Sequence, residues 1–403
     1  MDVIPARIDG WSNAVYLSNE FASLLIAPEA GRILQYKVCG KDLFFVNDEM
    51  RGHVSTFAEA AASSEWNNYG GARFDVAPQS SWKKTSWKKE WPPPPLLNSR
   101  RELSASDVSV CMNTAPDVEM MGARVSADIS LIPGSSIVRI EQTISNVGKN
   151  SIEWANWCVA QLAADAGRST IYVPSAADSA FKDGYTLMMS PADGDKHPSF
   201  TSIGAGRVSS FLFDGREWKF GFDSREWIAL RPESDEDMVF VMASRIARGA
   251  RYPDDGCSVE LYTSAHMPYV ELELLCPLER IAQDGRRRDR YWWAAASCRG
   301  EVVDVNDCGV MSAPLCCREG NLRGRFGVFY RGTARVIARD RSGNESSLAA
   351  IEVSPAKPFD IDMRMQAAGK YAGFRIELES EFVGKGEAGG KIRGILATAD
   401  AEC

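Results

Sequence analysis

The sequence predicts an all-β protein, and three observations support this prediction. Short runs of apolar or alternating residues recur along most of the chain, and Asn, Pro and Gly separate them. Only one short candidate helix is found, over residues 56–63. Hydrophobic residues make up 45% and charged residues 25% of the 403 positions, which is the balance of a folded chain with a packed core.

Individual strands follow from these runs. The first are expected at residues 14–17, 21–27 and 32–38, each bounded by turn residues. Residues 123–132 and 137–144 both alternate, and Pro133, Gly134 and Ser135 between them complete a hairpin pattern. Further strands are expected at residues 218–222, 227–231, 238–243, 258–263 and 269–275.

Two segments lack the alternation and are expected to be irregular. Residues 65–97 hold four of the eleven tryptophans, two Lys-Lys pairs and four consecutive prolines, which indicate extended, polyproline-like chain. Residues 284–322 are rich in Arg and Cys.

Strand-like runs resume beyond the second irregular segment, at residues 334–339, 349–353 and 374–378. We therefore expect two parts: a large β-domain over residues 1–305 and a small immunoglobulin-like β-module over residues 306–403.

Composition and charge exclude several classes of function. The chain has 54 acidic and 46 basic residues and a net charge of -8, which argues against a protein that wraps nucleic acid. It holds no apolar stretch long enough for a bilayer and no Gly-rich nucleotide motif. Three histidines are too few for a multi-histidine metal site. The sequence thus indicates no metal, cofactor, nucleic-acid or membrane partner.

The cysteines and the first residues bear on the compartment. The ten cysteines form no Cys-x-x-Cys pair, which favours reduced and mostly buried thiols. Residues 1–7 show no secretion-signal pattern, so the chain as written is expected to be cytoplasmic. The alternative is a periplasmic or secreted protein whose leader was removed, with candidate disulfides among Cys298, Cys308, Cys316 and Cys317.

Residues 65–79 combine the side chains that saccharides bind. Trp66 and Tyr69 offer aromatic planes for the apolar face of a pyranose. Asn68, Arg73 and Gln79 offer groups that hydrogen-bond to hydroxyls. An ordinary loop, with tryptophans packed on the sheet and glycines in turns, explains the same residues about equally well.

Four lysines follow among tryptophans of the same segment, Lys83, Lys84, Lys88 and Lys89. Charge next to aromatic rings suits an acidic saccharide, such as a uronate or a sulfated sugar. A solvated basic loop is the alternative, and a single-strand nucleic-acid platform is disfavoured by the acidic total.

A pair of carboxylates lies in the strand expected at residues 269–275. Glu271 and Glu273 are two residues apart and therefore share one face. On a concave sheet face they would bind hydroxyls, or one would act as a base whose pKa is raised by burial or by its neighbour. A solvated outer face is the alternative.

Five segments occur in an order that is similar to a known family: residues 18–21, 28–33, 40–44, 68–79 and 144–148. Together they resemble an uncharacterised bacterial family of the galactose-mutarotase-like superfamily, over about residues 10–295. The resemblance implies a β-supersandwich of large antiparallel sheets whose concave face binds carbohydrate. Aldose epimerases, glycoside hydrolase domains and polysaccharide lyases share this architecture, so it does not select a reaction.

The resemblance to aldose epimerases extends to single residues. Their catalytic glutamate lies in a Cys-Leu-Glu-type strand similar to Glu271-Leu272-Glu273, which implies that Glu273 is the base. Trp157 stands where these enzymes carry their acid histidine. Because tryptophan cannot protonate a ring oxygen, the acid would have to be His53, His266 or a tyrosine such as Tyr69 or Tyr262. A Trp157 that stacks on the sugar would instead favour saccharide binding.

We therefore expect a carbohydrate-active protein. Its expected binding residues are Trp66, Asn68, Arg73, Gln79, Trp157 and Glu271. If it is an enzyme, Glu273, His266 and Tyr69 would perform epimerase-like or lyase-like chemistry, and elimination on a uronic-acid glycoside fits the basic loop. The alternative is a non-catalytic sugar-binding or scaffold protein of a polysaccharide-utilisation pathway. The sequence gives no indication of the oligomeric state.

Overall fold

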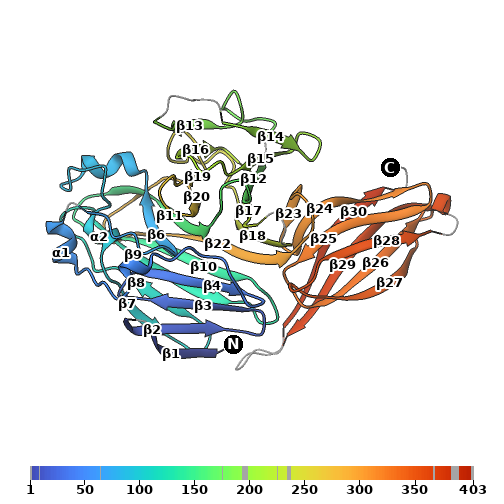
Figure 1. Ribbon diagram of the computed structural model, residues 1–403, viewed down its shortest axis with the longest axis horizontal. Helices are drawn as coiled ribbons and strands as arrows, with labels where there is room; N and C mark the ends of the chain where they lie inside the picture. The colour runs from blue at the N-terminus through green and yellow to red at the C-terminus, as the bar shows by residue number, and fades with distance from the viewer. Residues whose placement is uncertain are drawn as a thin grey trace.

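The computed structural model describes residues 2–8, 10–63, 65–174, 176–192, 198–224, 226–233, 237–365, 368–382 and 390–400. The chain is all-β, as predicted, and its strands form four sheets with antiparallel pairing (Figure 1). Five short helices accompany them: α1 (Phe57–Ala62), α2 (Pro95–Asn98) and the 3₁₀ helices η1 (Asp48–Met50), η2 (Gln79–Lys84) and η3 (Ala368–Lys370).

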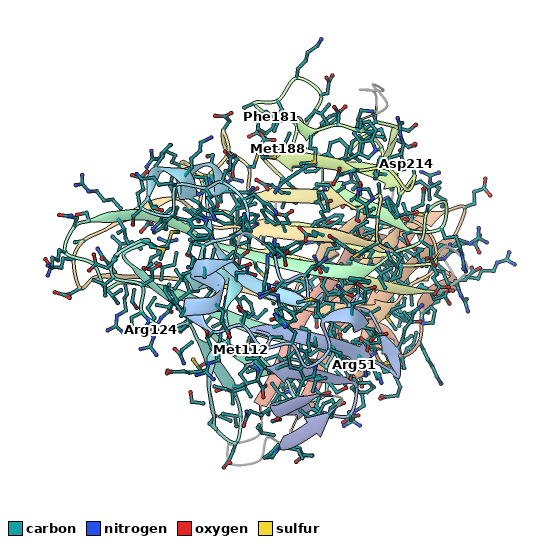
Figure 2. All side chains as sticks on the ribbon, turned by 60° about the vertical axis from the view of Figure 1, so that its left-hand side comes forward. Arg51, Met112, Arg124, Phe181, Met188 and Asp214 are labelled. Atoms are coloured by element: carbon teal, nitrogen blue, oxygen red, sulfur yellow. The ribbon has the colours of Figure 1, made fainter. Side chains whose placement is uncertain are left out.

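The first large sheet has twelve strands. Ten of them follow the order β1-β2-β3-β4-β6-β11-β20-β19-β16-β13, with β5 beside β4 and β21 beside β11. One edge strand, β13, carries the exposed Met188 (Figure 2). The strands are β1 (Asp2–Ile8), β2 (Trp11–Ser18), β3 (Ala22–Ala27), β4 (Arg32–Val38), β5 (Lys41–Asp42), β6 (Ala72–Ala77), β11 (Ile152–Ala163), β13 (Thr186–Met189), β16 (Trp218–Phe222), β19 (Val259–Thr263), β20 (Tyr269–Leu275) and β21 (Glu279–Ile281).

The second large sheet has ten strands in the order β14-β15-β12-β17-β18-β22-β10-β9-β8-β7. They are β7 (Glu102–Ala105), β8 (Val110–Asn113), β9 (Ala123–Leu131), β10 (Val138–Asn146), β12 (Thr170–Pro174), β14 (Phe200–Ile203), β15 (Val208–Leu212), β17 (Trp227–Arg231), β18 (Met238–Ser244) and β22 (Arg286–Ser297).

The C-terminal part forms two four-stranded sheets, in the orders β23-β24-β25-β28 and β27-β26-β29-β30. Their strands are β23 (Asp304–Asn306), β24 (Gly309–Arg318), β25 (Asn321–Val328), β26 (Gly332–Asp340), β27 (Glu345–Val353), β28 (Phe359–Arg364), β29 (Tyr371–Phe382) and β30 (Gly390–Asp400).

The two large sheets pack face to face around the main core. Phe74 on β6 stacks on Trp293 on β22, with ring centroids 6.5 Å apart. Cys158 on β11 is paired in register with Phe74 and with Leu274 on β20, so these side chains share the inward face. Because side chains alternate along a strand, the odd-numbered residues of β6, β11 and β20 lie on the opposite face.

The C-terminal sheets pack on the outer side of the ten-stranded sheet, at β18 and β22 (Figure 1). A second core there joins Val241 and Ala294 to Val310 and Phe326. Trp292 packs edge-on against Phe329, with centroids 5.5 Å apart. The proposed division of the chain at about residue 305 lies close to the start of β23 and stays a prediction.

Several predicted strands match the structure, and two irregular segments were wrongly assigned. Residues 218–222, 227–231 and 269–275 are strands over the predicted bounds. The segment 284–322, expected to be irregular, contains β22 and β24. In β22 the inward positions include the charged Asp289, and Ala294 to Ala296 are buried on both faces, which hides the alternation. The segment 65–97 contains β6, which is buried at every position for the same reason.

Two further features concern the cysteines and membranes. Six of the nine cysteines in the described ranges are buried. Cys403 and His197 lie outside the described residues. No helix in the described part of the chain has the length and apolar character required to cross a membrane.

We predict that Gly71→Ala destabilises the fold much more than Gly40→Ala. Both glycines have positive φ, +68° and +87°, so either alanine should cost about 1–2 kcal/mol. A Cβ at Gly71 would lie 2.2 Å from the Ile33 carbonyl oxygen, whereas nothing lies within 4 Å at Gly40. Overpacking should therefore cost Gly71→Ala about 1–3 kcal/mol more. Urea denaturation measures both variants, and equal unfolding free energies would contradict the close approach of β4 and β6.

Candidate functional site

Seven polar side chains gather on the face of the twelve-stranded sheet that points away from the ten-stranded sheet. We call them the buried charged cluster: Arg73 and Asp75 on β6, Gln161 on β11, Lys219 on β16, Glu260 on β19, and Glu271 and Glu273 on β20. All except Lys219 are at most 6% exposed, and the Lys219 side chain is 15% exposed. Strand register brings them together, because Gln161 pairs with Glu271 and Glu260 pairs with Glu273.

One half of the cluster is organised by Arg73. Its Nε donates to Asp75 Oδ2 at 2.7 Å and its Nη1 to Glu271 Oε1 at 3.2 Å. Gln161 Nε2 also donates to Glu271 Oε1, at 2.7 Å. Burial lowers the pKa of Arg73, but Glu271 and Asp75 outweigh it and hold the pKa above its ordinary value. Arg73 therefore stays charged.

The other half surrounds Glu273. Its Oε2 accepts a hydrogen bond from Trp157 Nε1 at 2.8 Å and lies 3.5 Å from Lys219 Nζ. Lys219 Nζ is 2.8 Å from Glu260 Oε2 and 5.0 Å from the centre of the Trp157 ring. Glu260 and Glu273 occupy directly opposed positions on neighbouring strands, where two carboxylates would repel each other. The Lys219 ammonium group lies close to both and offsets this repulsion.

Glu273 consequently holds its proton unusually tightly. Burial raises the pKa of Glu273 to about 8, the Lys219 ammonium opposes the shift, and the carboxylates of Glu260 and Glu271 add to it. Burial likewise raises the pKa of Glu260, against the effect of Lys219 and with a further contribution from Asp254. At neutral pH the site therefore contains a neutral carboxylic acid close to a fixed ammonium group.

The cluster leaves several acceptors unused. Among the described residues of the cluster, three acceptor oxygens are buried without a hydrogen-bond partner: Asp75 Oδ1, Gln161 Oε1 and Glu260 Oε1. Glu273 Oε1 also has no partner, and it carries the proton of the neutral acid because Oε2 accepts from Trp157 and Lys219. Leaving a buried polar atom unpaired typically costs about 1–3 kcal/mol, so native proteins rarely accumulate such atoms on one face. A ligand rich in hydrogen-bond donors would satisfy them.

The structure brings together four of the residues predicted for the site. Arg73, Trp157, Glu271 and Glu273 belong to the cluster or contact it directly. Trp66 also borders it, because the Arg73 guanidinium lies 5.2 Å from the centre of its ring. The indole Nε1 of Trp66 is buried without a partner.

The other predicted residues lie apart from Glu273. Tyr69 packs on Trp11 and lies over Arg32, and burial raises the pKa of its hydroxyl to about 12. His266 is exposed, and its backbone N–H donates to Ser264 Oγ. Asn68 Nδ2 contacts Met267 Sδ at 3.5 Å, and Gln79 begins η2. Within the described residues, no hydrogen bond or ion pair joins any of these side chains to Glu273.

Sequence reasoning missed the residues that complete the cluster: Asp75, Gln161, Lys219 and Glu260. A weak signal existed for two of them. Lys219 is a lone charge between Trp218 and Phe220, and Glu260 lies between Val259 and Leu261. A single charged residue in a short apolar strand is also typical of a strand with one solvated face, so only the structure shows that both are buried.

The Trp- and Lys-rich part of residues 65–97 packs against the cluster through Trp82. Trp82 is fully buried, and its ring centroid lies 6.1 Å from that of Trp157. Trp87 is also buried, and Lys89 lies over its ring at 4.5 Å. Trp91 is 47% exposed, so among these three it retains a ring accessible for stacking. In the described part of the chain, no group of three His, Cys, Asp or Glu is placed to hold a metal.

Comparison with known proteins gives the following relatives. Residues 13–186 match a family model described as a domain of unknown function, DUF4380. No curated protein matches the chain. Solved structures that are similar include the Slr1438 protein from Synechocystis (13% identity, 74% of this chain and 99% of that chain, TM-score 0.45) and galactose mutarotase-like proteins from Lactobacillus casei (10%, 70% and 100%, 0.47) and Clostridium acetobutylicum (9%, 73% and 98%, 0.46).

Identities of 9–13% say nothing about reaction or substrate. The chemistry therefore has to be argued from this chain's own residues.

We predict that Glu273→Gln removes part of the pH dependence of stability. The ordinary pKa of 4.5 applies to the unfolded chain, and the folded value is about 8, so between these values only the folded state holds this proton. Wild-type unfolding free energy should therefore fall as pH rises from about 4.5 to about 8. The variant should lack this contribution and gain relative to wild type above pH 7.

Urea denaturation at intervals from pH 5 to pH 9 measures this difference. Glu381→Gln, on an exposed side chain, is the matched control and should follow the wild type. Parallel pH profiles for Glu273→Gln and wild type would contradict the raised pKa.

Proposed function

We propose that this chain is a carbohydrate-active protein that binds a saccharide at the buried charged cluster. The observation that carries the proposal is the set of three buried acceptor oxygens without a donor, those of Asp75, Gln161 and Glu260, beside the unpaired Glu273 Oε1 on the same face of the sheet. Each saccharide hydroxyl can donate one hydrogen bond, and neighbouring hydroxyls donate to neighbouring acceptors. Trp66 borders the cluster and would supply aromatic surface for the apolar face of a sugar ring. Trp157 does not have the stacking role expected from the sequence, because its ring is buried against Lys219 and Trp82.

For catalysis, Glu273 is the group we assign to proton transfer. A pKa of about 8 lies close to neutral pH, where a carboxyl group serves both as acid and as base. Lys219 is the cation nearest to Glu273, and its ion pair with Glu260 helps to hold it charged. It would stabilise negative charge that develops on a substrate oxygen when Glu273 removes a proton. Epimerase-like and lyase-like reactions both need this combination.

A non-catalytic saccharide-binding protein is the second candidate, and one observation favours it. Trp157 stands where an acid histidine stands in aldose epimerases, and its indole N–H occupies Glu273 Oε2. Glu273 is also fully buried, so a substrate would have to move its cover to reach it. Binding in that case would use Arg73, Gln161 and Glu271 without a chemical step.

A saccharide screen tests the proposal. Neutral, uronic and sulfated saccharides are screened by thermal shift, and each hit is assayed for reducing or unsaturated products by absorbance. We expect at least one saccharide to bind. Gln161→Leu should weaken that binding, because it removes the amide that donates a hydrogen bond to Glu271. Failure of every saccharide class to bind would overturn the proposal.

The same hits separate the two candidates. For an enzyme, we expect Glu273→Gln to lower kcat by about 10²- to 10⁴-fold while binding persists. The exposed Glu381→Gln should leave turnover unchanged. Binding without any product in the wild type would favour the non-catalytic protein.

A further inference from the structure

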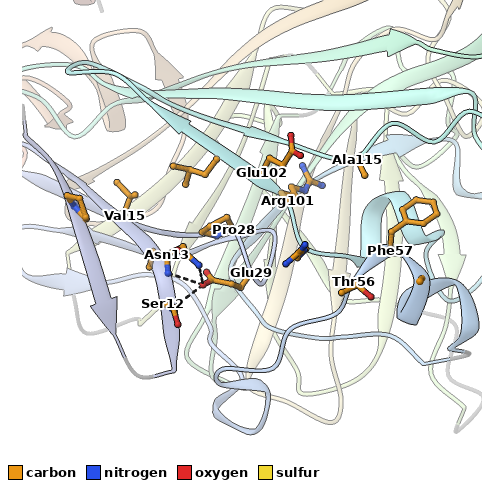
Figure 3. A pocket seen from close by; sticks show the side chains of 15 residues that line it. Ser12, Asn13, Val15, Pro28, Glu29, Thr56, Phe57, Arg101, Glu102 and Ala115 are labelled. Carbon is orange, nitrogen blue, oxygen red and sulfur yellow. Dashed lines mark hydrogen bonds between the residues drawn. The ribbon is translucent and has the colours of Figure 1, made fainter.

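A hollow of about 930 Å³ opens beside β1 and β2, at one edge of the twelve-stranded sheet (Figure 3). Its wall is formed by Ser12 and Asn13 of β2, by Glu29 in the turn between β3 and β4, by Thr56 before α1, and by the segment 100–103. None of its lining residues belongs to the buried charged cluster. Its volume lies in the range of small-molecule sites.

Arg101 lines this hollow and is 5% exposed. Its Nη2 donates to the Phe74 carbonyl at 2.7 Å, but its Nε and Nη1 are buried and have no hydrogen-bond partner. The backbone is fixed on both sides, because Arg101 N–H donates to the Pro28 carbonyl and Arg100 N–H to the Ser55 carbonyl, each at 2.7 Å. The guanidinium is thus held in place with donors to spare.

A second buried guanidinium, that of Arg32, lies close to Arg101. Arg32 is 2% exposed, and its Nη1 donates to the Gly31 carbonyl at 3.2 Å. A Cβ on Gly31 would lie 3.3 Å from Arg101 Cγ, so both side chains contact Gly31. In the described ranges neither arginine has a carboxylate within 4.0 Å, since Asp75 pairs with Arg73 instead. Buried charges are normally paired, so two neighbouring buried guanidinium groups without a carboxylate partner favour an anion.

The opposite wall offers an acceptor. Glu29 Oε1 accepts from the backbone N–H groups of Ser12 and Asn13 and from Asn13 Nδ2, at 2.8–3.0 Å (Figure 3). Its Oε2 is buried without a partner. These unpaired atoms are buried, so a ligand in the hollow would have to displace the groups that cover them in order to pair an anionic group with Arg101 and a donor with Glu29.

We propose that this hollow binds a small sugar acid, whose carboxylate pairs with Arg101 and whose hydroxyl donates to Glu29. The two oxygens of a carboxylate match two N–H groups of one guanidinium in the fork geometry that arginine prefers. Arg100, exposed on the same segment, adds a second positive charge to the hollow. The site goes beyond the proposed function, because it shares no residue with the buried charged cluster.

Titration calorimetry with D-glucuronate, D-glucose and inorganic phosphate tests the proposal. We expect glucuronate to bind and the neutral sugar and phosphate to bind at least tenfold more weakly. Absence of glucuronate binding, or phosphate binding as tight as that of glucuronate, would overturn the sugar-acid site.

Variants then place the ligand. We expect Arg101→Gln to weaken glucuronate binding at least tenfold, and Arg100→Gln and Glu29→Gln to weaken it threefold or more. Arg100→Gln changes an exposed side chain and therefore tests the site even if Arg101→Gln fails to fold. Arg323→Gln, exposed on the C-terminal sheets, is the matched control.

Gln161→Leu distinguishes this hollow from the buried charged cluster. It should leave glucuronate binding at the hollow unchanged, whatever its effect on the saccharides of the proposed function. Glucuronate binding that is lost in Gln161→Leu but retained in Arg100→Gln and Arg101→Gln would overturn the assignment to the hollow.

Discussion

Face-to-face packing of the two large sheets is the constraint on which the rest of the structure depends. Phe74 and Trp293 meet in that core, and their strands are thereby fixed in orientation. The alternation of side chains then forces Arg73 and Asp75 onto the opposite face, together with Glu273 on its own strand. A shift in register by one residue in any of these strands would turn its charged side chains into the core and its apolar side chains out of it. The packing of the apolar face therefore fixes the position of the charged cluster.

Burial gives this cluster its chemical character. The same carboxylates on a solvated face would titrate normally and contribute little. Glu273 is fully buried beside Trp157, whose ring packs on Trp82, and it therefore keeps its proton near neutral pH. Acceptor oxygens of the cluster remain unused. Unpaired buried polar atoms are costly, so the packing of the rest of the fold has to offset them.

The hollow at Arg101 shows the opposite polarity. There the unused donors are Nε and Nη1 of the single guanidinium of Arg101, whereas the cluster around Glu273 presents unused acceptors. The turn after β3 and the segment before β7 create this hollow, and both are held by backbone hydrogen bonds. Two regions of one sheet thus favour complementary parts of a ligand, an anionic group at one and hydroxyls at the other.

The sequence by itself determined the all-β class, many strands and the pair Glu271 and Glu273, because alternation and turn residues are local signals. It also pointed to Arg73 and Trp157, through aromatic composition and family resemblance. Only the tertiary structure decided that Lys219, Glu260, Asp75 and Gln161 join them, because strand register between segments distant in sequence sets those contacts. It likewise decided which charges lose their water, since burial depends on what packs above a strand and not on the strand's own residues.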